Sequence, residues 1–426
     1  LDRSSAAADV YKRQLYNILA KKIPDWRYNY KKLLDQKGNI VIGDVTIEKA
    51  LSGMRGVKGL ACDTSYVTAD EGLHIRGTHI LDLVHILPEE VLHLLLTGDI
   101  PNKAMLADLQ SDLKNRNEVP SYIWDILNNM PKDSHPMAMF NTAILSMQKE
   151  SQFYKAYDAG VSKTKYWHTT LEDSLNIIAK LPAIAAYIYR LRFDKGKRIE
   201  SNKDLDWSAD FVHMMGFDSD SEMTKLMRLY LMLHCDHEAG NVSAFSAMTV
   251  NSALSDPYYA LSAGLNGLAG PLHGLANQNC LRFVLSIRDH FKGSPSEADL
   301  KQFIWDRLNS GRVIPGYGHA VLRCPDPRFT AFMNFGKEHV TDDEIFDIVN
   351  KLFKIVPPVL KEHGKAKNPW PNVDAASGAL LHHYGLKEFE FYTVLFSISR
   401  SSVSYTHLRA HETLRYLVCR ILLEKK

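Results

Sequence analysis

The sequence predicts an all-α protein with a minor β or extended element near the N-terminus. Two observations support this fold class. Apolar residues recur with the period of amphipathic helices from Leu83 to the 390s, and strand-like alternation is rare after residue 80. At 426 residues the chain can bury a large core, so we expect two domains rather than one.

Composition and charge exclude several function classes. Hydrophobic residues make up 45% and charged residues 23% of the chain, as is ordinary for a globular protein. No apolar run reaches about 18 residues, so no membrane partner is expected. A formal net charge of +2 gives no basic footprint for nucleic acid. The cysteines are scattered without a CxxC pair, which favours reduced thiols over a disulfide framework or zinc site; they are Cys62, Cys235, Cys280, Cys324 and Cys419.

Near the N-terminus, residues 15–37 are rich in lysine and tyrosine and are compatible with a helix. Residues 38–60 mix a short apolar alternation with several glycines. This pattern predicts a small strand or extended segment, followed by a glycine-rich turn around Arg55.

Residues 221–238 show a helical pattern with recognisable end signals. Ser219 and Glu222 have the spacing of a capping box, and Gly240 offers a C-terminal stop. We therefore expect one helix that continues to Glu238.

Two further helical segments contain or precede proline. Residues 343–356 carry an apolar face, and Pro357 and Pro358 are expected to end that helix because proline lacks the N–H donor. Within residues 173–193, Pro182 is expected to kink or break the helix.

The segment 310–328, SGRVIPGYGHAVLRCPDPR, concentrates three glycines, three prolines, three arginines and one histidine, His319. Glycine lets backbone amides approach a ligand, and proline stiffens the turns around them. A mobile linker would not need a cation every few residues. We therefore interpret the segment as a preformed anion-binding loop that presents His319.

GLAGPLHGLANQ (267–278) places His273 just before a helical run. The positive end of a helix disfavours imidazolium, and a neutral imidazole can donate a hydrogen bond to a carbonyl oxygen as negative charge develops there. From spacing alone, a capping or packing histidine at a helix start is the more common explanation.

KNPWPNVDAASG (367–378) places Asp374 among prolines, a tryptophan and small residues. Partly apolar surroundings raise the pKa of a carboxylate and make it a better base. An N-cap for the helix that follows explains Asp374 equally well from the sequence alone.

The run HCDHE places His234 and His237 three residues apart on an expected helix, which suggests a metal site. It lacks the HExxH spacing, and no other ligand cluster is evident, so we expect no metal. We favour a helix end that points His237 into a cleft; a structural histidine bonded to nearby backbone remains an alternative.

Arg328 in PDPR and Arg400 in SISR are candidate carboxylate ligands. Guanidinium presents a planar fork that matches a carboxylate in a bidentate manner, which lysine does not reproduce. A single arginine is more often a solvated surface residue, so neither position stands out by itself.

Four of these segments together resemble the citrate synthase family, in that family's order: LHCDHEAGNVSA (233–244), GLAGPLHGLANQ, PGYGHAVLR followed by DPR, and KNPWPNVDAASG. The chain is similar to the eukaryotic, mitochondrial type from about Leu15 to Arg400. The resemblance implies an all-α fold with a large domain, residues 15–274 and 380–400, and a smaller helical domain, residues 275–379. It also implies a homodimer in the mitochondrial matrix.

The resemblance further implies condensation of acetyl-CoA with oxaloacetate and water to give citrate and CoA. No cofactor is needed, since acetyl-CoA is a substrate. In this family Asp374 would remove a methyl proton, His273 would stabilise the thioester oxygen and His319 would polarise the ketone. Residues His237, Arg328 and Arg400 would hold the oxaloacetate carboxylates. The residues placed near coenzyme A are Arg55, Lys163, Val313, Pro315, Gly316, Tyr317, Gly318, Arg323, Lys367 and Asn368.

The two ends, residues 1–14 and 401–426, depart from the family pattern and resemble translated adapter sequence. In relatives the region after Arg400 embraces the other subunit and supplies an arginine to its active site. We find no matching context for that arginine in residues 401–426, so we expect weaker activity and dimerisation.

Three alternatives remain open at this stage. A 2-methylcitrate synthase would use propionyl-CoA, and one methylene is worth only about 1–3 kcal/mol of discrimination, which the sequence does not decide. A non-catalytic helical assembly protein with this fold is a second alternative, against which His273, His319 and Asp374 argue. Acyl-CoA binding without turnover is the third.

Overall fold

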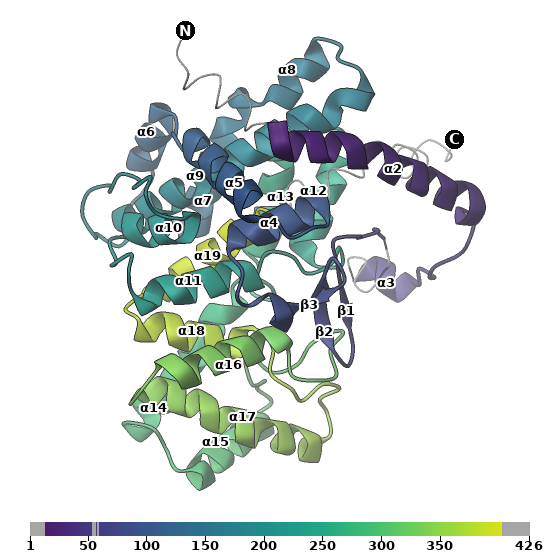
Figure 1. Cartoon of the computed structure of the whole chain (residues 1–426). Coiled ribbons are helices and arrows are strands. Elements are labelled where there is room, and N and C mark those ends of the chain that lie inside the picture. Colours follow the sequence, from purple (N-terminus) through teal and green to yellow (C-terminus); the bar gives the residue numbers. More distant parts are fainter. Residues whose placement is uncertain (1–12, 53–56, 58, 403–426) are drawn as a thin grey trace.

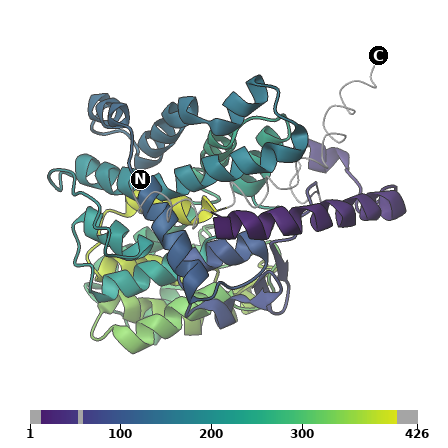
Figure 2. The same cartoon turned by 45° about the horizontal axis from the view of Figure 1, so that its top comes forward.

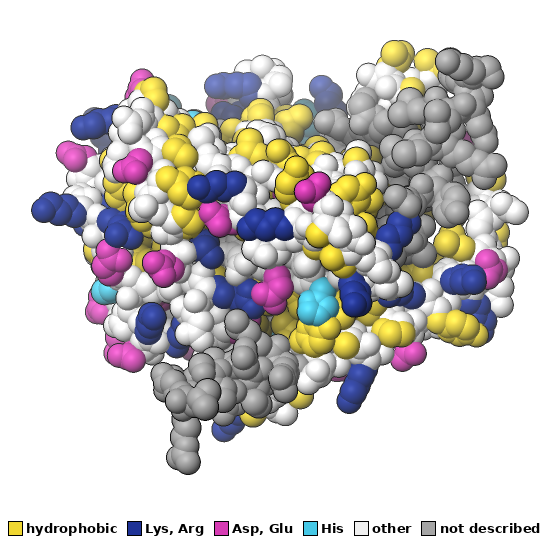
Figure 3. All heavy atoms as spheres, turned by 90° about the horizontal axis from the view of Figure 1, so that it is seen from above, with side chains coloured by type: hydrophobic (Ala, Val, Ile, Leu, Met, Phe, Trp, Pro, Cys, Tyr) yellow, Lys and Arg dark blue, Asp and Glu magenta, His cyan; other side chains and the backbone are white. Residues whose placement is uncertain are grey.

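The structure is a computed structural model that describes residues 13–402 apart from 53–56 and 58 (Figure 1). The described residues form mainly helices, with one small sheet, so the predicted all-α class with minor β is confirmed. None of the described helices is both long and apolar enough to cross a membrane. On the face seen in Figure 3, acidic and basic side chains are interspersed, with hydrophobic side chains between them.

The elements follow one another in two runs. The first run is α2 (Arg13–Lys37), α3 (Ile47–Leu51), β1 (Ser65–Thr68), β2 (Gly72–Ile75), β3 (Thr78–His79), η1 (Ile80–Leu83), α4 (Pro88–Thr97), α5 (Lys103–Arg116), α6 (Ser121–Asn129), α7 (Pro136–Ser146), η2 (Met147–Glu150), α8 (Gln152–Asp158) and η3 (Lys163–Lys165). The second run is α9 (Tyr166–Arg192), α10 (Trp207–Met215), α11 (Glu222–Leu233), α12 (Val242–Asn251), α13 (Pro257–Leu268), α14 (Ala276–Phe291), α15 (Glu297–Asn309), α16 (Pro327–His339), α17 (Glu344–His363), α18 (Asp374–His383), η4 (Phe389–Phe391) and α19 (Tyr392–Arg400).

Helix packing separates the chain into two groups. Helix α9 contacts α5, α7, α8, α10 and α19, whereas α14, α16 and α17 each contact α18 and α15 contacts α17 at the other end of the molecule (Figure 1). Helix α11 contacts both α16 and α18 and so joins the groups. One hydrophobic core cluster contains buried residues from both groups.

The N-terminal region agrees with the sequence in part. Helix α2 confirms the helix expected over residues 15–37, and its second half projects from the body of the molecule (Figure 2). Residues 40–46 lack secondary structure, and a short helix, α3, follows where the strand or extended segment was expected to give way to a turn. The predicted turn around Arg55 lies outside the described residues.

The small sheet instead comprises three antiparallel strands in the order β1–β2–β3. Ser65 pairs with Ile75 and Thr68 with Gly72, so β1 and β2 form a hairpin. Gly72 has a φ of +95°, a conformation that glycine adopts without steric cost. This hairpin brings residues 64–76 to the boundary between the two groups of helices, since η1 just after it contacts α16.

The predicted ends of the 221–238 helix are wrong. Its N-cap is Ser221 and not Ser219, and α11 ends at Leu233. After Leu233 the backbone leaves the helical conformation, and Glu238 has a left-handed φ of +47°. The segment that carries His237 is therefore a loop.

The helix ends predicted at proline are also wrong. Pro357 and Pro358 lie inside α17, which continues to His363 and ends before Gly364. A proline inside a helix costs about 3 kcal/mol, but Val359 and Leu360 are both buried, and burying such a side chain contributes about 1.5–3 kcal/mol. Pro182 likewise does not break its helix, because it lies within α9; the kink expected there stays a prediction.

Candidate active site

The loops at the ends of α11, α13, α15 and α17 bring together side chains that are far apart in the sequence. The rings of His237 and His319 lie 5.5 Å apart between centroids. After burial, the charge of Arg328 is the next largest influence on the pKa of His237, His319 and Asp374. Arg328 and Arg400 also act on His273, whose ring lies 5.7 Å from that of Phe396. The predicted catalytic and carboxylate-binding residues thus share one cluster.

His319 is held in one orientation by its own loop. Its Nδ1 accepts hydrogen bonds from the backbone N–H groups of Val321 (3.0 Å) and Leu322 (3.1 Å). A ring nitrogen that accepts has no proton, so the neutral imidazole carries its proton on Nε2. Burial, and then the charge of Arg328, lowers the pKa of His319 to about 4. The ring is therefore a neutral donor at physiological pH.

His273 lies in the turn before α14, as the sequence indicated. Its Nε2 is 3.0 Å from the Ser243 hydroxyl, which donates to Oδ1 of Asn241 at 2.6 Å. Because the hydroxyl has one proton, Nε2 of His273 is the donor in this arrangement. Burial, followed by the charges of Arg400 and Arg328, lowers the pKa of His273 to about 3. The imidazole is therefore neutral at physiological pH.

Asp374 is the first residue of α18, and Val373 occupies the N-cap position without a side-chain hydrogen bond. The explanation of Asp374 as an N-cap is therefore wrong. Burial raises its pKa to about 7, the nearby Arg328 opposes the rise and Asp326 adds to it. A half-buried carboxylate with such a pKa can accept a proton near neutral pH.

The two arginines are buried and not solvated at the surface, each being 4% exposed. Arg328 donates from Nε (3.0 Å) and Nη2 (2.7 Å) to the carboxylate of Asp326. Arg400 donates from Nε to the carbonyl oxygen of His234 at 3.0 Å, and its Nη1 has no hydrogen-bond partner among the described residues. Burial lowers the pKa of Arg400 to about 10, while Asp236 supports the charged form.

The two histidines of HCDHE differ in their hydrogen bonding. His234 is fully buried and its Nδ1 bonds to the carbonyl oxygen of Tyr230 at 2.9 Å, so it is a structural histidine. His237 lies in the loop beyond α11, and its Nε2 is buried without a partner in the described part of the chain. Burial, with Arg328, lowers the pKa of His237 well below its usual value. The described residues hold no group of three possible metal ligands.

The glycine-rich loop is preformed by pairing with residues 370–372. Gly318 N–H donates to the Trp370 carbonyl and Asn372 N–H to the Gly316 carbonyl, each at 2.9 Å, and Tyr317 forms a bridge with Pro371. Gly316 and Gly318 have φ values of +80° and +104°. The Gly318 amide that we expected to face a nucleotide therefore already has a backbone partner.

The remaining predicted coenzyme A residues are spread more widely. Val313, Arg323 and Lys367 are exposed close to the glycine-rich loop, and Asn368 is buried with its Nδ2 unpartnered among the described residues. Lys163 lies in η3, which packs on α9 in the other group of helices. Arg55 lies outside the described residues.

Several residues of the cluster were missed in the sequence. Asp326, the N-cap of α16, could have been found from the Asp-Pro start signal in PDPR. Ser243 and Asn241 stand in the NVS of a segment we had singled out, and Asn241 is the N-cap of α12. No local pattern shows that Ser243 contacts His273.

A buried cluster that combines a carboxylate of raised pKa, neutral imidazoles and two guanidinium groups in a helical fold is typical of an acid–base enzyme. The profile described as "Citrate synthase, C-terminal domain" matches residues 53–419. The chain belongs to the citrate synthase family. The match extends past Arg400, where we expected the similarity to end.

Named relatives agree with this assignment. Citrate synthase 4, mitochondrial, of Arabidopsis thaliana is 47% identical over 397 residues, covering 91% of this chain and 84% of the relative. A mitochondrial 2-methylcitrate synthase of Yarrowia lipolytica is also 47% identical, over 90% of this chain and 84% of its own length. The crystal structure of citrate synthase from Pyrobaculum aerophilum matches with a TM-score of 0.78 at 28% identity, covering 88% of this chain and 93% of that one. The mitochondrial relatives support the localisation expected from the sequence.

The hydrogen bonds of His319 predict its tautomer. We expect the ring to remain neutral at about pH 6 and to carry its proton on Nε2, because Nδ1 accepts two backbone N–H groups. Ring-nitrogen chemical shifts from ¹⁵N NMR report both properties, with His319→Gln to assign the signals. A charged ring or an Nδ1 proton at that pH contradicts the prediction.

Proposed function

We propose that this chain condenses acetyl-CoA with oxaloacetate and water to give citrate and CoA. The observation that carries the proposal is the shared cluster of Asp374, with a pKa of about 7, and the neutral imidazoles of His273 and His319. A base and two uncharged donors are what a carbanion addition to a ketone requires. Family membership supports the reaction class.

The first step is removal of a methyl proton from the thioester by Asp374. Such protons are far less acidic than a carboxylic acid, so the thioester oxygen needs a hydrogen bond as charge develops on it. His273 supplies that bond. Its Nε2 faces Ser243, so donation from Nδ1 requires the Ser243 hydroxyl to turn from Asn241 toward Nε2.

The second step is attack of the resulting carbon on the oxaloacetate ketone. His319 donates from Nε2 to the ketone oxygen, and His237, Arg328 and Arg400 hold the carboxylates. Asp326 uses Nε and Nη2 of Arg328, which leaves Nη1 for the substrate. Water then hydrolyses the citryl thioester to release citrate and CoA.

The coenzyme A phosphates are placed at the exposed cations Arg323 and Lys367, beside the glycine-rich loop, with Arg55 and Lys163 as further candidates. Of these, Lys163 has the least support within one chain, because it packs with the other group of helices. The pantetheine runs along Val313, Pro315, Gly316, Tyr317, Gly318 and Asn368.

The two groups of helices support a division into two domains. Residues 275–379 form the small domain, and residues 15–274 with 380–400 form the large one. Closure of the small domain over oxaloacetate would complete the cluster and exclude water from the thioester. The enzyme works as a homodimer in the mitochondrial matrix.

A 2-methylcitrate synthase is the second candidate, because a relative of that name is as similar as the citrate synthases. The two reactions share every group named above and differ in the room given to one methyl group. A non-catalytic role is disfavoured by the raised pKa of Asp374, because strongly perturbed pKa values gather mainly at functional sites.

Removal of the base tests the mechanism directly. Asp374→Asn should lower oxaloacetate-dependent thiol release by about 10²–10⁴-fold, because the amide does not accept the proton. Asp133→Asn, at an exposed turn after α6, is the matched control and should leave turnover unchanged. Equal turnover of Asp374→Asn and wild type would rule out this role.

The raised pKa of Asp374 predicts the pH dependence. The base works unprotonated, so kcat/KM for the acyl-CoA should fall about tenfold per pH unit below about 7 and level off above it. An ordinary aspartate would keep the rate constant down to about pH 4. Rates between about pH 5 and 8.5 decide this, with circular dichroism at each pH to confirm that the protein stays folded.

Acyl selectivity distinguishes the two candidates. If the chain is a citrate synthase, kcat/KM for acetyl-CoA should exceed that for propionyl-CoA by about 10–200-fold, the range for one methylene. Thiol release with each thioester at fixed oxaloacetate measures the ratio. Equal or faster reaction with propionyl-CoA identifies a 2-methylcitrate synthase.

A further inference from the structure

The β1–β2 hairpin comprises residues 64–76, and its base forms hydrogen bonds with the loop that carries His237. The Thr64 hydroxyl donates to Oδ2 of Asp236 at 2.5 Å, and the N–H of Glu238 donates to the Ser65 hydroxyl oxygen at 2.6 Å. Two adjacent hairpin residues thus hold the residues on either side of His237. The other carboxylate oxygen of Asp236 accepts the His237 N–H at 2.8 Å, which completes the connection.

These contacts stabilise a buried carboxylate, Asp236, and a left-handed backbone conformation, at Glu238. Asp236 is 0% exposed, and a buried carboxylate is tolerated only when it is hydrogen-bonded. Glu238 has a left-handed backbone, uncommon for a residue other than glycine, and Asn241 also bonds to its carbonyl oxygen at 2.9 Å. Loss of a hairpin partner would therefore let the His237 loop rearrange.

The tip of the same hairpin touches the loop that carries His319 and Arg328. Arg323 N–H donates to the Ala69 carbonyl oxygen at 2.7 Å. Gly72 packs so closely on Pro327 that an added Cβ would lie 2.5 Å from its Cδ. Both contacts fall between His319 and Arg328 in the chain.

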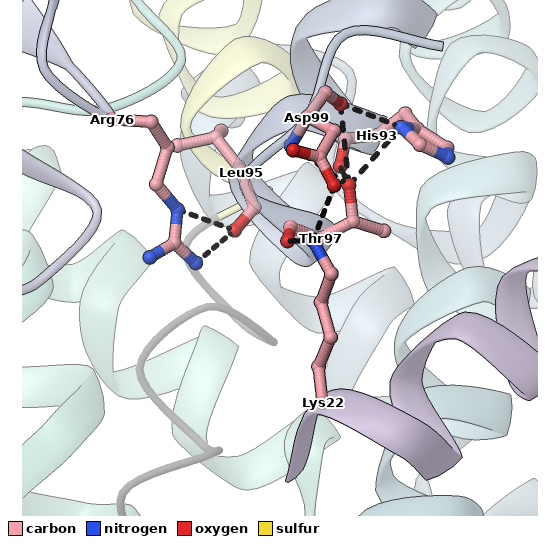
Figure 4. A network of polar contacts seen from close by, with 6 residues as sticks. All are labelled: Lys22, Arg76, His93, Leu95, Thr97 and Asp99. Atoms are coloured by element: carbon pink, nitrogen blue, oxygen red, sulfur yellow. Dashed lines mark hydrogen bonds and ion pairs between the residues drawn. The ribbon is translucent and has the colours of Figure 1, made fainter. Parts of the chain in front are cut away.

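The hairpin base is itself fixed to the body of the protein. Arg76 donates from Nε (3.2 Å) and Nη2 (2.6 Å) to the Leu95 carbonyl oxygen at the end of α4. Figure 4 shows this contact beside the one that Lys22 of α2 makes with Thr97 and Asp99. The base of the hairpin is therefore held against α4, which α2 contacts as well.

We propose that this hairpin sets the separation between His237 and the His319–Arg328 segment, and that Thr64, Ser65 and Gly72 are positioning residues for the dicarboxylate acceptor. The inference rests on the proposed function, because it takes oxaloacetate as the ligand of these side chains. The hairpin touches both halves of the carboxylate-binding cluster. Its contact with Arg323, which is assigned to the acyl-CoA, is made by the backbone N–H and leaves the guanidinium free of the hairpin. We therefore expect it to affect the affinity for oxaloacetate more than that for the acyl-CoA.

The role of the hairpin base, residues Thr64 and Ser65, is tested by Thr64→Val. This substitution keeps the shape of the side chain and removes the hydroxyl donor. The Kd of oxaloacetate by calorimetry and its KM should rise about tenfold, as expected for a lost hydrogen bond to a buried charge, while the KM for the acyl-CoA changes less than about twofold. Thr64→Ser retains the donor and should restore the wild-type values. If Thr64→Val does not fold, Ser65→Ala replaces it.

The tip is tested by a matched pair of glycine substitutions in the same sheet. Gly72 and Gly77 both have left-handed φ values, +95° and +84°, so alanine brings similar strain at each. The added Cβ meets Pro327 at Gly72 but nothing within 4 Å at Gly77. Gly72→Ala should raise the Kd of oxaloacetate several-fold, about threefold or more, and Gly77→Ala should not.

The outcomes separate this inference from the proposed function. If wild type turns over and both Thr64→Val and Gly72→Ala bind oxaloacetate as wild type does, the hairpin is only structural and the inference alone fails. If the variants lose melting temperature but keep the Kd, it fails as well. If wild type neither binds nor turns over oxaloacetate, the proposed function fails and the inference with it.

Discussion

The pairing of Arg328 with Asp326 inside the protein is the interaction on which the candidate site depends. Both side chains are almost fully buried, and two charge-assisted hydrogen bonds join them. An unpaired charge would be too costly at this position, whereas a paired one is tolerated. Once held there, the guanidinium adds to the effect of burial and disfavours a second positive charge on His237 and His319.

The same charge limits the rise of the Asp374 pKa. Burial disfavours the charged form of this carboxyl, and a direct ion pair with an arginine would make it a weak base. The charge of Arg328 lowers the Asp374 pKa against the effect of burial, while the Arg328 guanidinium donates its hydrogen bonds to Asp326. The pKa of Asp374 is about 7 as a result. One buried ion pair thus keeps the imidazoles neutral and the carboxylate available.

Much of this could be predicted from the sequence, because local signals identify residues well. The helical period gave the fold class, and His273 and Asp374 stand out next to glycine and proline. Energies that depend on distant partners could not be predicted. The low pKa of His273 is caused by burial and then by the charges of Arg400 and Arg328, and Pro357 stays inside α17 because Val359 beyond it is buried. Sequence shows neither which cation approaches a histidine nor how deep a helix lies.

The unpartnered polar atoms of the cluster connect its stability to its ligand. His237 Nε2 and Arg400 Nη1 are buried without hydrogen-bond partners among the described residues. A buried polar atom that lacks any partner costs about 1–3 kcal/mol. The fold maintains them because α19 and the loop after α11 are fixed by other contacts, including those of Arg400 with His234 and of Thr64 with Asp236. A dicarboxylate that supplies acceptors here would recover that free energy on binding. The cost to the unliganded fold and the affinity for the acceptor therefore have the same physical origin.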